Sequence, residues 1–145
     1  MFSTVNVSAS GLTAQRLRMD LIADNIANVN TTRTEDGIPY RRKLAIFRER
    51  NSSFSNAMAS QMSGNQSAGE GVEVAGIRED TKPFKTVYRP NHPDANQEGY
   101  VEMPNINITS EMVDMISASR SYEANVTALN TTKRMALKAL EIGRG

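Results

Sequence analysis

Apolar side chains recur every seven residues near both ends of the chain, and this spacing is lost in the middle. Near the start the repeat runs through Val5, Leu12, Met19 and Ile26. Near the end it runs through Met115, Tyr122, Leu129 and Ala136. Such a repeat places an apolar stripe along one side of a helix, which then packs against a partner helix. The pattern predicts terminal helices that pair with each other or with those of similar subunits, and it favours an assembly protein over an enzyme.

The first helix is predicted over residues 3–29. Gly11 interrupts it at a cost of about 1 kcal/mol relative to alanine. The Asn and Thr side chains of residues 28–32 end it, because they compete with the helix for backbone hydrogen bonds.

The second helix is predicted to begin at Asn107 or Thr109, where Asn, Thr and Ser side chains are available as caps. Glu111 falls in its first turn, where a negative charge is favourable. The helix is predicted to end at about Ile142, because Gly143 is a good C-terminal stop.

The middle of the chain carries weaker signals. Residues 37–50 predict a turn and a strand, and residues 72–90 predict a return to strand structure with a second short run near the end. Prolines confine residues 90–105 to an extended or turning path. Residues 51–71 are rich in Ser, Asn, Gln and Gly, so we expect a mobile loop there.

These segments define the expected fold class, which is mainly α with a small β-rich middle. The long N- and C-terminal helices, residues 3–30 and 107–143, are expected to pack as an antiparallel coiled-coil-like pair and to form one axial domain. Residues 31–106 are expected to form a central segment of loops and short strands.

Composition supports a protein whose core is completed by neighbours. The chain has 145 residues, of which 39% are apolar, and it contains no Trp. Globular domains have a higher apolar share of roughly 45–50%. The formal net charge is +1, which gives no bulk electrostatic reason to expect nucleic acid as a partner. Cysteine is absent, so disulfides and thiolate metal sites are excluded.

The sequence indicates no membrane insertion and no classical secretion. It has no run of about 18 apolar residues that could span a membrane. Its first residues lack the positive and apolar regions of a cleavable signal peptide. We therefore expect either a cytoplasmic protein or one that is exported without a cleavable signal.

His92 is the only histidine, so neither a catalytic triad nor a two-histidine metal site can be built within one chain. The tripeptide His92-Pro93-Asp94 also marks J-domain cochaperones, where it joins two helices. Here prolines and Asn-rich sequence surround it and no basic helix precedes it, so a turn is the favoured interpretation.

Other charged residues also have plain structural explanations. The carboxylate pairs Glu35-Asp36 and Glu79-Asp80 are sequence neighbours in loop-like segments, so solvated charge is favoured over acid–base chemistry. A basic stretch follows Tyr40 and is favoured as a charged edge strand over a nucleic-acid patch, with an acidic face on a neighbouring subunit as another option. It comprises Arg41, Arg42, Lys43, Arg48 and Arg50. No catalytic, cofactor-binding or metal-binding residue is predicted.

Two passages near the ends resemble the signatures of bacterial flagellar axial proteins, a family of rod, hook and hook-associated subunits. One is Ser8-Ala9-Ser10-Gly11-Leu12, continued by the run from Asp24 to Thr32, and the other is Glu111-Met112-Val113-Asp114-Met115, followed by Ser121 to Asn125. Within that family the short middle, with Asn91-His92-Pro93-Asp94-Ala95-Asn96 and Gly99-Tyr100-Val101, resembles the basal-body rod proteins of the proximal rod. The family often has Asp where Asn96 stands.

This resemblance implies a structural subunit that polymerises helically and has no catalytic residues. Its partners would be copies of itself and other rod subunits, with its terminal helices packed in the wall of the rod. It would transmit motor torque for motility from a site in the basal body outside the cytoplasmic membrane. It would be exported by the flagellar type III apparatus without a cleavable signal peptide.

The stripes supply the predicted assembly interface. Its packing positions are Val5, Leu12, Met19, Ile22, Ile26, Met112, Met115, Tyr122, Val126, Leu129 and Leu140. Polar residues interrupt the stripes, and such residues fix register and partner choice. They are Ser8, Gln15, Arg16, Ser119 and Lys133. Asn25, Asn28 and Asn30 are predicted to cap the first helix and not to bind a ligand.

Two alternatives remain at this point. A soluble coiled-coil adaptor or export chaperone would use the same stripes to form a discrete oligomer. A small hydrolase would need a catalytic constellation that cannot be assembled from one His and no Cys.

Overall fold

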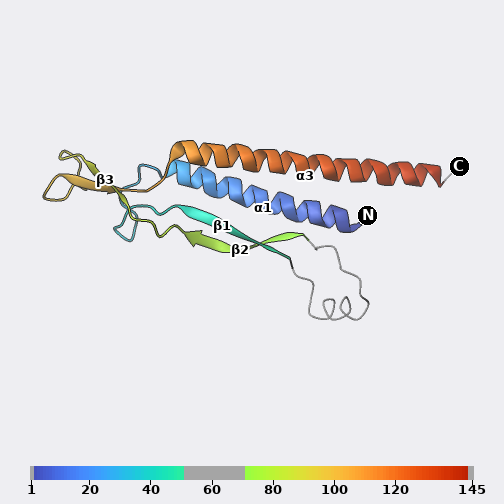
Figure 1. The fold of residues 1–145 in the computed structure, drawn as a ribbon, viewed down its shortest axis with the longest axis horizontal. Helices are drawn as coiled ribbons and strands as arrows, with labels where there is room; N and C mark the ends of the chain where they lie inside the picture. The colour runs from blue at the N-terminus through green and yellow to red at the C-terminus, as the bar shows by residue number, and fades with distance from the viewer. Residues whose placement is uncertain (1, 51–70, 144–145) are drawn as a thin grey trace, which may run out of the picture. The chain divides into compact units, whose positions relative to one another are not determined.

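The structure is a computed structural model, and it describes residues 2–50 and 71–143. In the order of the chain, a long helix comes first, short strands follow it, and a second long helix comes last (Figure 1). The elements are α1 (Phe2–Ala27), β1 (Lys43–Glu49), β2 (Val72–Glu79), β3 (Lys85–Tyr88), β4 (Tyr100–Met103) and α3 (Ile108–Ile142). Strand β1 pairs with β2, and β3 pairs with β4.

The chain divides into two compact units, each built from distant parts of the sequence. The first unit contains the described residues of 1–16, 46–76 and 119–145. The second unit contains residues 17–45 and 77–118. Each unit therefore holds a part of both terminal helices and a part of the central strands.

In the first unit, α1 and α3 approach closely at Gly11. A Cβ atom at this position would lie only 3.0 Å from the side-chain nitrogen of Asn125. The helix runs through Gly11 without a break, and the missing side chain is what permits the approach. The side chains buried in this unit are small or polar, and they are Ser8, Ser10, Ala14 and Thr132.

Ser10 also attaches the β1–β2 pair to α1 within this unit. Its hydroxyl donates to the carbonyl of Val7 at 2.7 Å and accepts from the backbone N–H of Val72 at 3.1 Å. Gly71 precedes Val72 with a φ of 108°, and a Cβ atom there would overlap the Ser10 hydroxyl. Glycine is therefore required at this position by both backbone conformation and space.

In the second unit, strands β3 and β4 form an antiparallel pair. Lys85 lies opposite Met103, and Tyr88 lies opposite Tyr100. Strand β4 was not predicted, because prolines and turn residues dominate residues 90–105 and leave only a short run of strand-forming residues at 100–103. Pairing with β3 makes this segment a strand, and Gly99, with a φ of 80°, provides the turn that starts it.

The helices run antiparallel in the second unit, since Arg18 contacts Asp114 and Asn25 contacts Glu111. Figure 1 shows α1 and α3 side by side, as the repeat predicted. The predicted fold class, with packed terminal helices and small antiparallel hairpins in the middle, is confirmed. Most of the predicted loop, residues 51–70, lies outside the described residues.

The α1 helix begins at Phe2 and ends at Ala27, slightly before the predicted end at residue 29. The α3 helix starts where predicted, because the side-chain oxygen of Asn107 accepts from the backbone N–H groups of Thr109 and Ser110. Neither α1 nor α3, as described, has an apolar stretch long enough to cross a membrane.

Candidate functional site

A buried polar network holds the second unit together. Its centre is formed by Asn25 on α1 and Glu111 in the first turn of α3, each of which is 1% exposed. The side-chain nitrogen of Asn25 donates to a carboxylate oxygen of Glu111 at 3.1 Å. This bond joins the two helices near the end of one and the start of the other.

Asn25 also binds the strand that follows α1. Its side-chain oxygen accepts from the backbone N–H of Lys43, and its nitrogen donates to the Lys43 carbonyl, both at 2.9 Å. The same oxygen accepts from the Tyr40 hydroxyl at 3.2 Å. One amide side chain thus satisfies polar groups from α1, β1 and α3, as a buried amide must.

Arg42 supplies the positive charge that the buried Glu111 carboxylate needs. Its Nε lies 2.5 Å from Glu111 Oε1, and its Nη2 lies 3.3 Å from Asp114 Oδ2. Arg18 on α1 reaches the other oxygen of Asp114 at 3.4 Å. Two guanidinium groups therefore bridge α1, the start of β1 and the first turns of α3. The N-terminal end of α3 adds a favourable dipole for the Glu111 carboxylate in its first turn.

Asn25 corrects a sequence prediction. It was expected to cap α1, but its side chain is fully used by Lys43, Tyr40 and Glu111. Asn28 stands at the helix end, and its side-chain nitrogen donates at 2.9 Å to the Asp24 carbonyl, which also accepts from the Asn28 backbone N–H at 3.0 Å. Asn25 lies before the helix end and faces β1 and α3, whereas Asn28 lies where backbone carbonyls lose their helical partners.

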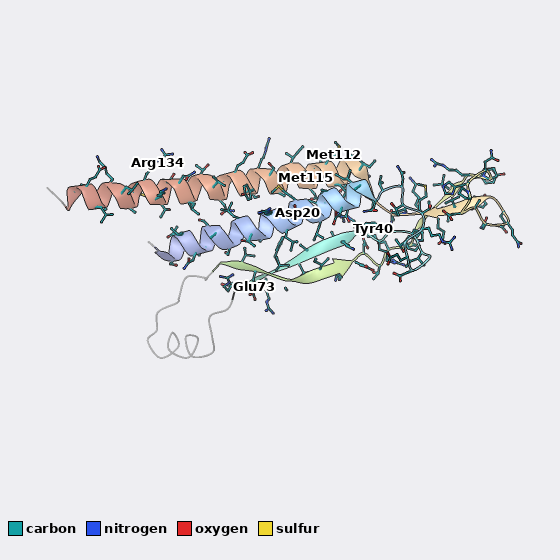
Figure 2. All side chains as sticks on the ribbon, turned by 180° about the vertical axis from the view of Figure 1, so that it is seen from behind. Asp20, Tyr40, Glu73, Met112, Met115 and Arg134 are labelled. Atoms are coloured by element: carbon teal, nitrogen blue, oxygen red, sulfur yellow. The ribbon has the colours of Figure 1, made fainter. Side chains whose placement is uncertain are left out.

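The environment of Tyr40, labelled in Figure 2, raises the pKa of its phenol above the ordinary value of 10.0. Partial burial is the largest cause, and the negative charges of Asp24, Glu79 and Glu111 add to it. Because the folded state favours the neutral phenol, Tyr40 stabilises the fold below pH 10 relative to higher pH. This contribution is lost as pH rises through the raised pKa.

We expect alkaline titration to show this group directly. The phenolate absorbance of the wild type minus that of the Tyr40→Phe variant should give a transition above pH 10. A difference transition at or below pH 10 would contradict the placement of Tyr40 in the network. The backbone circular dichroism of both proteins, recorded at each pH, separates titration of the phenol from unfolding.

The predicted basic stretch is split between internal contacts and the surface. Arg41 lies over the Phe84 ring at 4.4 Å and donates to the Asp80 carbonyl, and Arg42 belongs to the network. Arg48 pairs with Glu73, which Figure 2 labels, on the neighbouring strand. The prediction of a charged edge strand therefore misses the internal role of Arg42.

The predicted packing positions are only partly covered by their own chain. Ile22 is buried, whereas Met112 and Leu140 are exposed at 57% and 67%. The others are half-buried, and they are Val5, Leu12, Met19, Ile26, Met115, Tyr122, Val126 and Leu129. Figure 2 labels Met112 and Met115 on α3.

The α3 helix exposes large apolar side chains in both units, Met112 and Leu140 among them. In the second unit these are Ile108, Met112, Val113 and Ile116. In the first unit they are Met135, Leu137, Leu140 and Ile142. Clustered exposed apolar side chains typically mark a surface that contacts another protein. The heptad spacing of the sequence predicted an apolar stripe on this helix, but it did not identify all of these exposed residues.

The remaining candidate residues form a turn. His92 accepts a hydrogen bond from the backbone N–H of Asp94 at 3.2 Å, and Asp94 accepts from the Thr32 hydroxyl at 2.8 Å. The turn interpretation of this tripeptide is confirmed. Among the described residues, no group of three or more His, Asp or Glu side chains is placed to hold a metal ion.

Comparison with known families gives matches at both ends of the chain. Residues 5–33 match the family model described as flagella basal body rod protein. Residues 97–142 match the model described as flagellar basal body rod FlgEFG protein C-terminal. These are the two segments that form α1 and α3 with their immediate neighbours.

Individual relatives match over nearly the whole chain. The flagellar basal-body rod protein FlgC of Bacillus subtilis is 54% identical over 147 residues, covering 99% of this chain and 98% of the relative. The FlgC protein of Borreliella burgdorferi is 50% identical over 150 residues, covering 100% and 99%. The FlgC protein of Escherichia coli O6:H1 is 41% identical over 144 residues, covering 99% and 98%.

Proposed function

Because the chain belongs to the FlgC family of flagellar basal-body rod proteins, a non-enzymatic family of structural rod subunits that serves motility, we propose that it polymerises through its exposed helix faces. Assembly with rod subunits follows from the family. We infer more specifically that copies of this chain and other rod subunits cover the apolar stripes of α1 and α3, and that the resulting proximal rod transmits motor torque. Family membership leaves no support for the adaptor, chaperone and hydrolase alternatives.

The exposed apolar surface of α3 is the observation that supports this proposal. Its large side chains are exposed between 45% at Ile108 and 76% at Ile142. Burial of apolar surface is favourable by about 25 cal/mol for each Å² removed from water. A neighbouring helix placed on these residues would gain this free energy, which the isolated chain cannot.

Polar groups buried in the first unit would set the register of α1 against α3. Ser8 and Thr132 are buried, and the Gln15 side-chain oxygen is buried with no hydrogen-bond partner among the described residues. Burying an unpaired polar group is costly, so a partner position that supplies a donor is preferred over a shifted one. Fixed register is what a shaft under torque requires.

The site of assembly is part of the same proposal. We place the subunit in the basal-body rod outside the cytoplasmic membrane, after export by the flagellar type III apparatus without a cleavable signal. Family membership supports this placement. Fractionation of cells followed by mass spectrometry of the first residue of the rod-associated protein tests it.

Alanine substitution at Leu12 and Leu129 tests the stripes directly. Both side chains are half-buried in the isolated chain, and Leu→Ala changes cost about 2–5 kcal/mol when the side chain is fully buried. We expect the double variant to lose rod assembly and motility in a strain that has no other copy of the gene. Basal bodies purified from that strain and counted by electron microscopy give the measurement.

A matched control is available on the same helices. Thr13→Ala and Asn130→Ala each change an exposed neighbour of the tested leucines and should leave rods and motility intact. Normal motility of the Leu12→Ala, Leu129→Ala strain would contradict the proposed stripes. Complete rods in a strain that lacks the gene would contradict the proposed function itself.

A further inference from the structure

The β3–β4 hairpin presents two faces of opposite character. Side chains alternate between the faces of a strand, so the register of this pair sorts its residues into two sets. One face carries Lys85, Val87, Met103 and the buried Val101, continued by Arg89 after the strand. The other carries Thr86, Tyr88, Tyr100 and Glu102.

The first face lines a groove of about 840 Å³ in the second unit. Residues that follow α1 and residues that lead into the start of α3 complete its walls. Val87, Ile106 and Ile108 are among its apolar lining residues. Lys85 and Arg89 contribute two positive charges, and no Asp or Glu is among the lining residues. We call this surface the basic groove.

The second face is acidic and aromatic. Tyr88 and Tyr100 pack edge to face with ring centroids 5.3 Å apart, yet they are 63% and 44% exposed. Glu102 and Asp94 border a smaller hollow of about 290 Å³ beside Tyr100. Arg33 lies 3.8 Å from Asp94 and offsets part of its charge, so Glu102 is the main negative group. We call this surface the acidic–aromatic face.

The two faces complement each other. A Lys or Arg side chain is attracted both by a carboxylate and by the face of a tyrosine ring. The charges lie on opposite sides of one thin hairpin, so they cannot meet within the same chain. They can meet between copies, because the groove of one copy offers cations where the face of the next offers a carboxylate and two rings.

We propose that the basic groove of one copy binds the acidic–aromatic face of the next copy. This deepens the proposed function and rests on it, since it names a contact by which the subunit polymerises. The contact joins two different surfaces, so it is heterologous. A row of copies joined in this way has an unoccupied basic groove at one end and an unoccupied acidic–aromatic face at the other. Contacts of this kind generate open helical assemblies unless the rotation closes a ring. An isolated two-stranded hairpin is also only marginally stable, and two neighbouring copies, one on each side, would cover both of its faces.

Charge reversal tests the contact. Lys85→Glu and Glu102→Lys should each lower the number of complete rods per cell by about tenfold or more, because like charges then meet across the interface. The double variant Lys85→Glu, Glu102→Lys should recover rods, because opposite charges meet again with reversed sign. Arg78→Glu, an exposed cation on β2 outside the groove, is the matched control and should assemble normally.

Cysteine pairs give a second readout that does not depend on the size of a charge effect. The natural chain contains no cysteine, so a chain with Lys85→Cys and Glu102→Cys carries only the introduced thiols. Oxidation of isolated basal bodies by copper phenanthroline should give a ladder of dimers, trimers and longer disulfide-linked copies. The pair Arg78→Cys with Glu102→Cys should give no ladder.

The outcomes separate this inference from the proposed function. Loss with either single reversal, recovery in the double variant and a cross-linked ladder support the contact. Normal rods with both single reversals, failure of the double variant to recover, or cross-links only to a protein of different mass would overturn it. In each of these cases the proposed function would still be supported if the double variant Leu12→Ala, Leu129→Ala lost its rods.

Discussion

Replacing Arg42 by alanine is expected to destabilise the second unit by about 3–5 kcal/mol, because it leaves a buried carboxylate without its cation. Glu111 is 1% exposed, and Arg42 is the cation that contacts it, at 2.5 Å. Without the guanidinium, the side-chain partner that the carboxylate keeps among the described residues is the neutral Asn25 amide. Urea unfolding of the purified chain, followed by circular dichroism, measures the loss.

Two milder variants calibrate this result. Arg42→Lys keeps the charge but not the planar fork that reaches Glu111 and Asp114 together, so its cost should be intermediate. Asp114→Ala removes a carboxylate that is 35% exposed, and pairs of that kind contribute about 0–1 kcal/mol. Equal unfolding midpoints for Arg42→Ala and Asp114→Ala would show that the charge of Arg42 does not stabilise the buried Glu111 carboxylate.

Removing both charges should be tolerated better than removing one. A chain with Arg42→Met and Glu111→Leu keeps the volume of both side chains and has no buried ion. Such exchanges are often neutral or stabilising. We expect its unfolding midpoint to exceed that of Arg42→Ala, and a lower midpoint would point to packing instead of charge.

The second large effect is expected for Asn25→Asp, which changes one atom and adds one charge. The new carboxylate would face the Glu111 carboxylate at the position where the Asn25 nitrogen now lies, 3.1 Å from it. Two like charges at such a distance repel by about 5 kcal/mol at an effective dielectric constant near 20. Arg42, which contacts Glu111, offsets part of this, so we expect a loss of about 2–4 kcal/mol in the same unfolding assay.

The chain itself offers a compensating change and a control. Glu111→Gln in the Asn25→Asp background exchanges the donor and the acceptor of the bond, so the double variant should recover much of the loss. Asn30→Asp adds the same charge at an exposed position and should change stability by less than about 0.5 kcal/mol. Additive losses in the double variant would contradict a direct bond between these two side chains.

The network matters for the proposed role because it makes a stiff joint from three elements. Arg42 and Asn25 tie the chain leaving α1 to the first turn of α3 by charge-assisted and amide hydrogen bonds. A subunit that transmits torque must pass force between elements without slipping. Directional bonds resist such slipping better than apolar contacts, which are not directional.

Much of the secondary structure followed from local signals. The heptad spacing of Leu12 and Leu129, the Asn107 cap and the prolines around His92 all act over a few residues, so they could be interpreted without a fold. Strand β4 was missed because residues 100–103 become a strand only through pairing with β3. The residues before them carry turn signals and no alternation.

The polar network could not be predicted in the same way. Glu111 was expected to stabilise the start of α3, and Asn25 was expected to cap α1, since those are their roles within a single helix. Arg42 is 69 residues from Glu111 in the sequence, and it was assigned to a charged edge strand. No pattern within a short window links residues at this separation.

By itself, the sequence determined the two terminal helices, their apolar stripes and the family signatures at both ends, because helix periodicity and caps are encoded within a few neighbouring residues. The tertiary structure decided which polar groups are buried together and which side chains line each face of the β3–β4 hairpin. Burial and cross-strand register depend on contacts between segments far apart in the chain. Asn25, Arg42 and Glu111 are the clearest case, because each becomes a network residue only when α1, β1 and α3 meet.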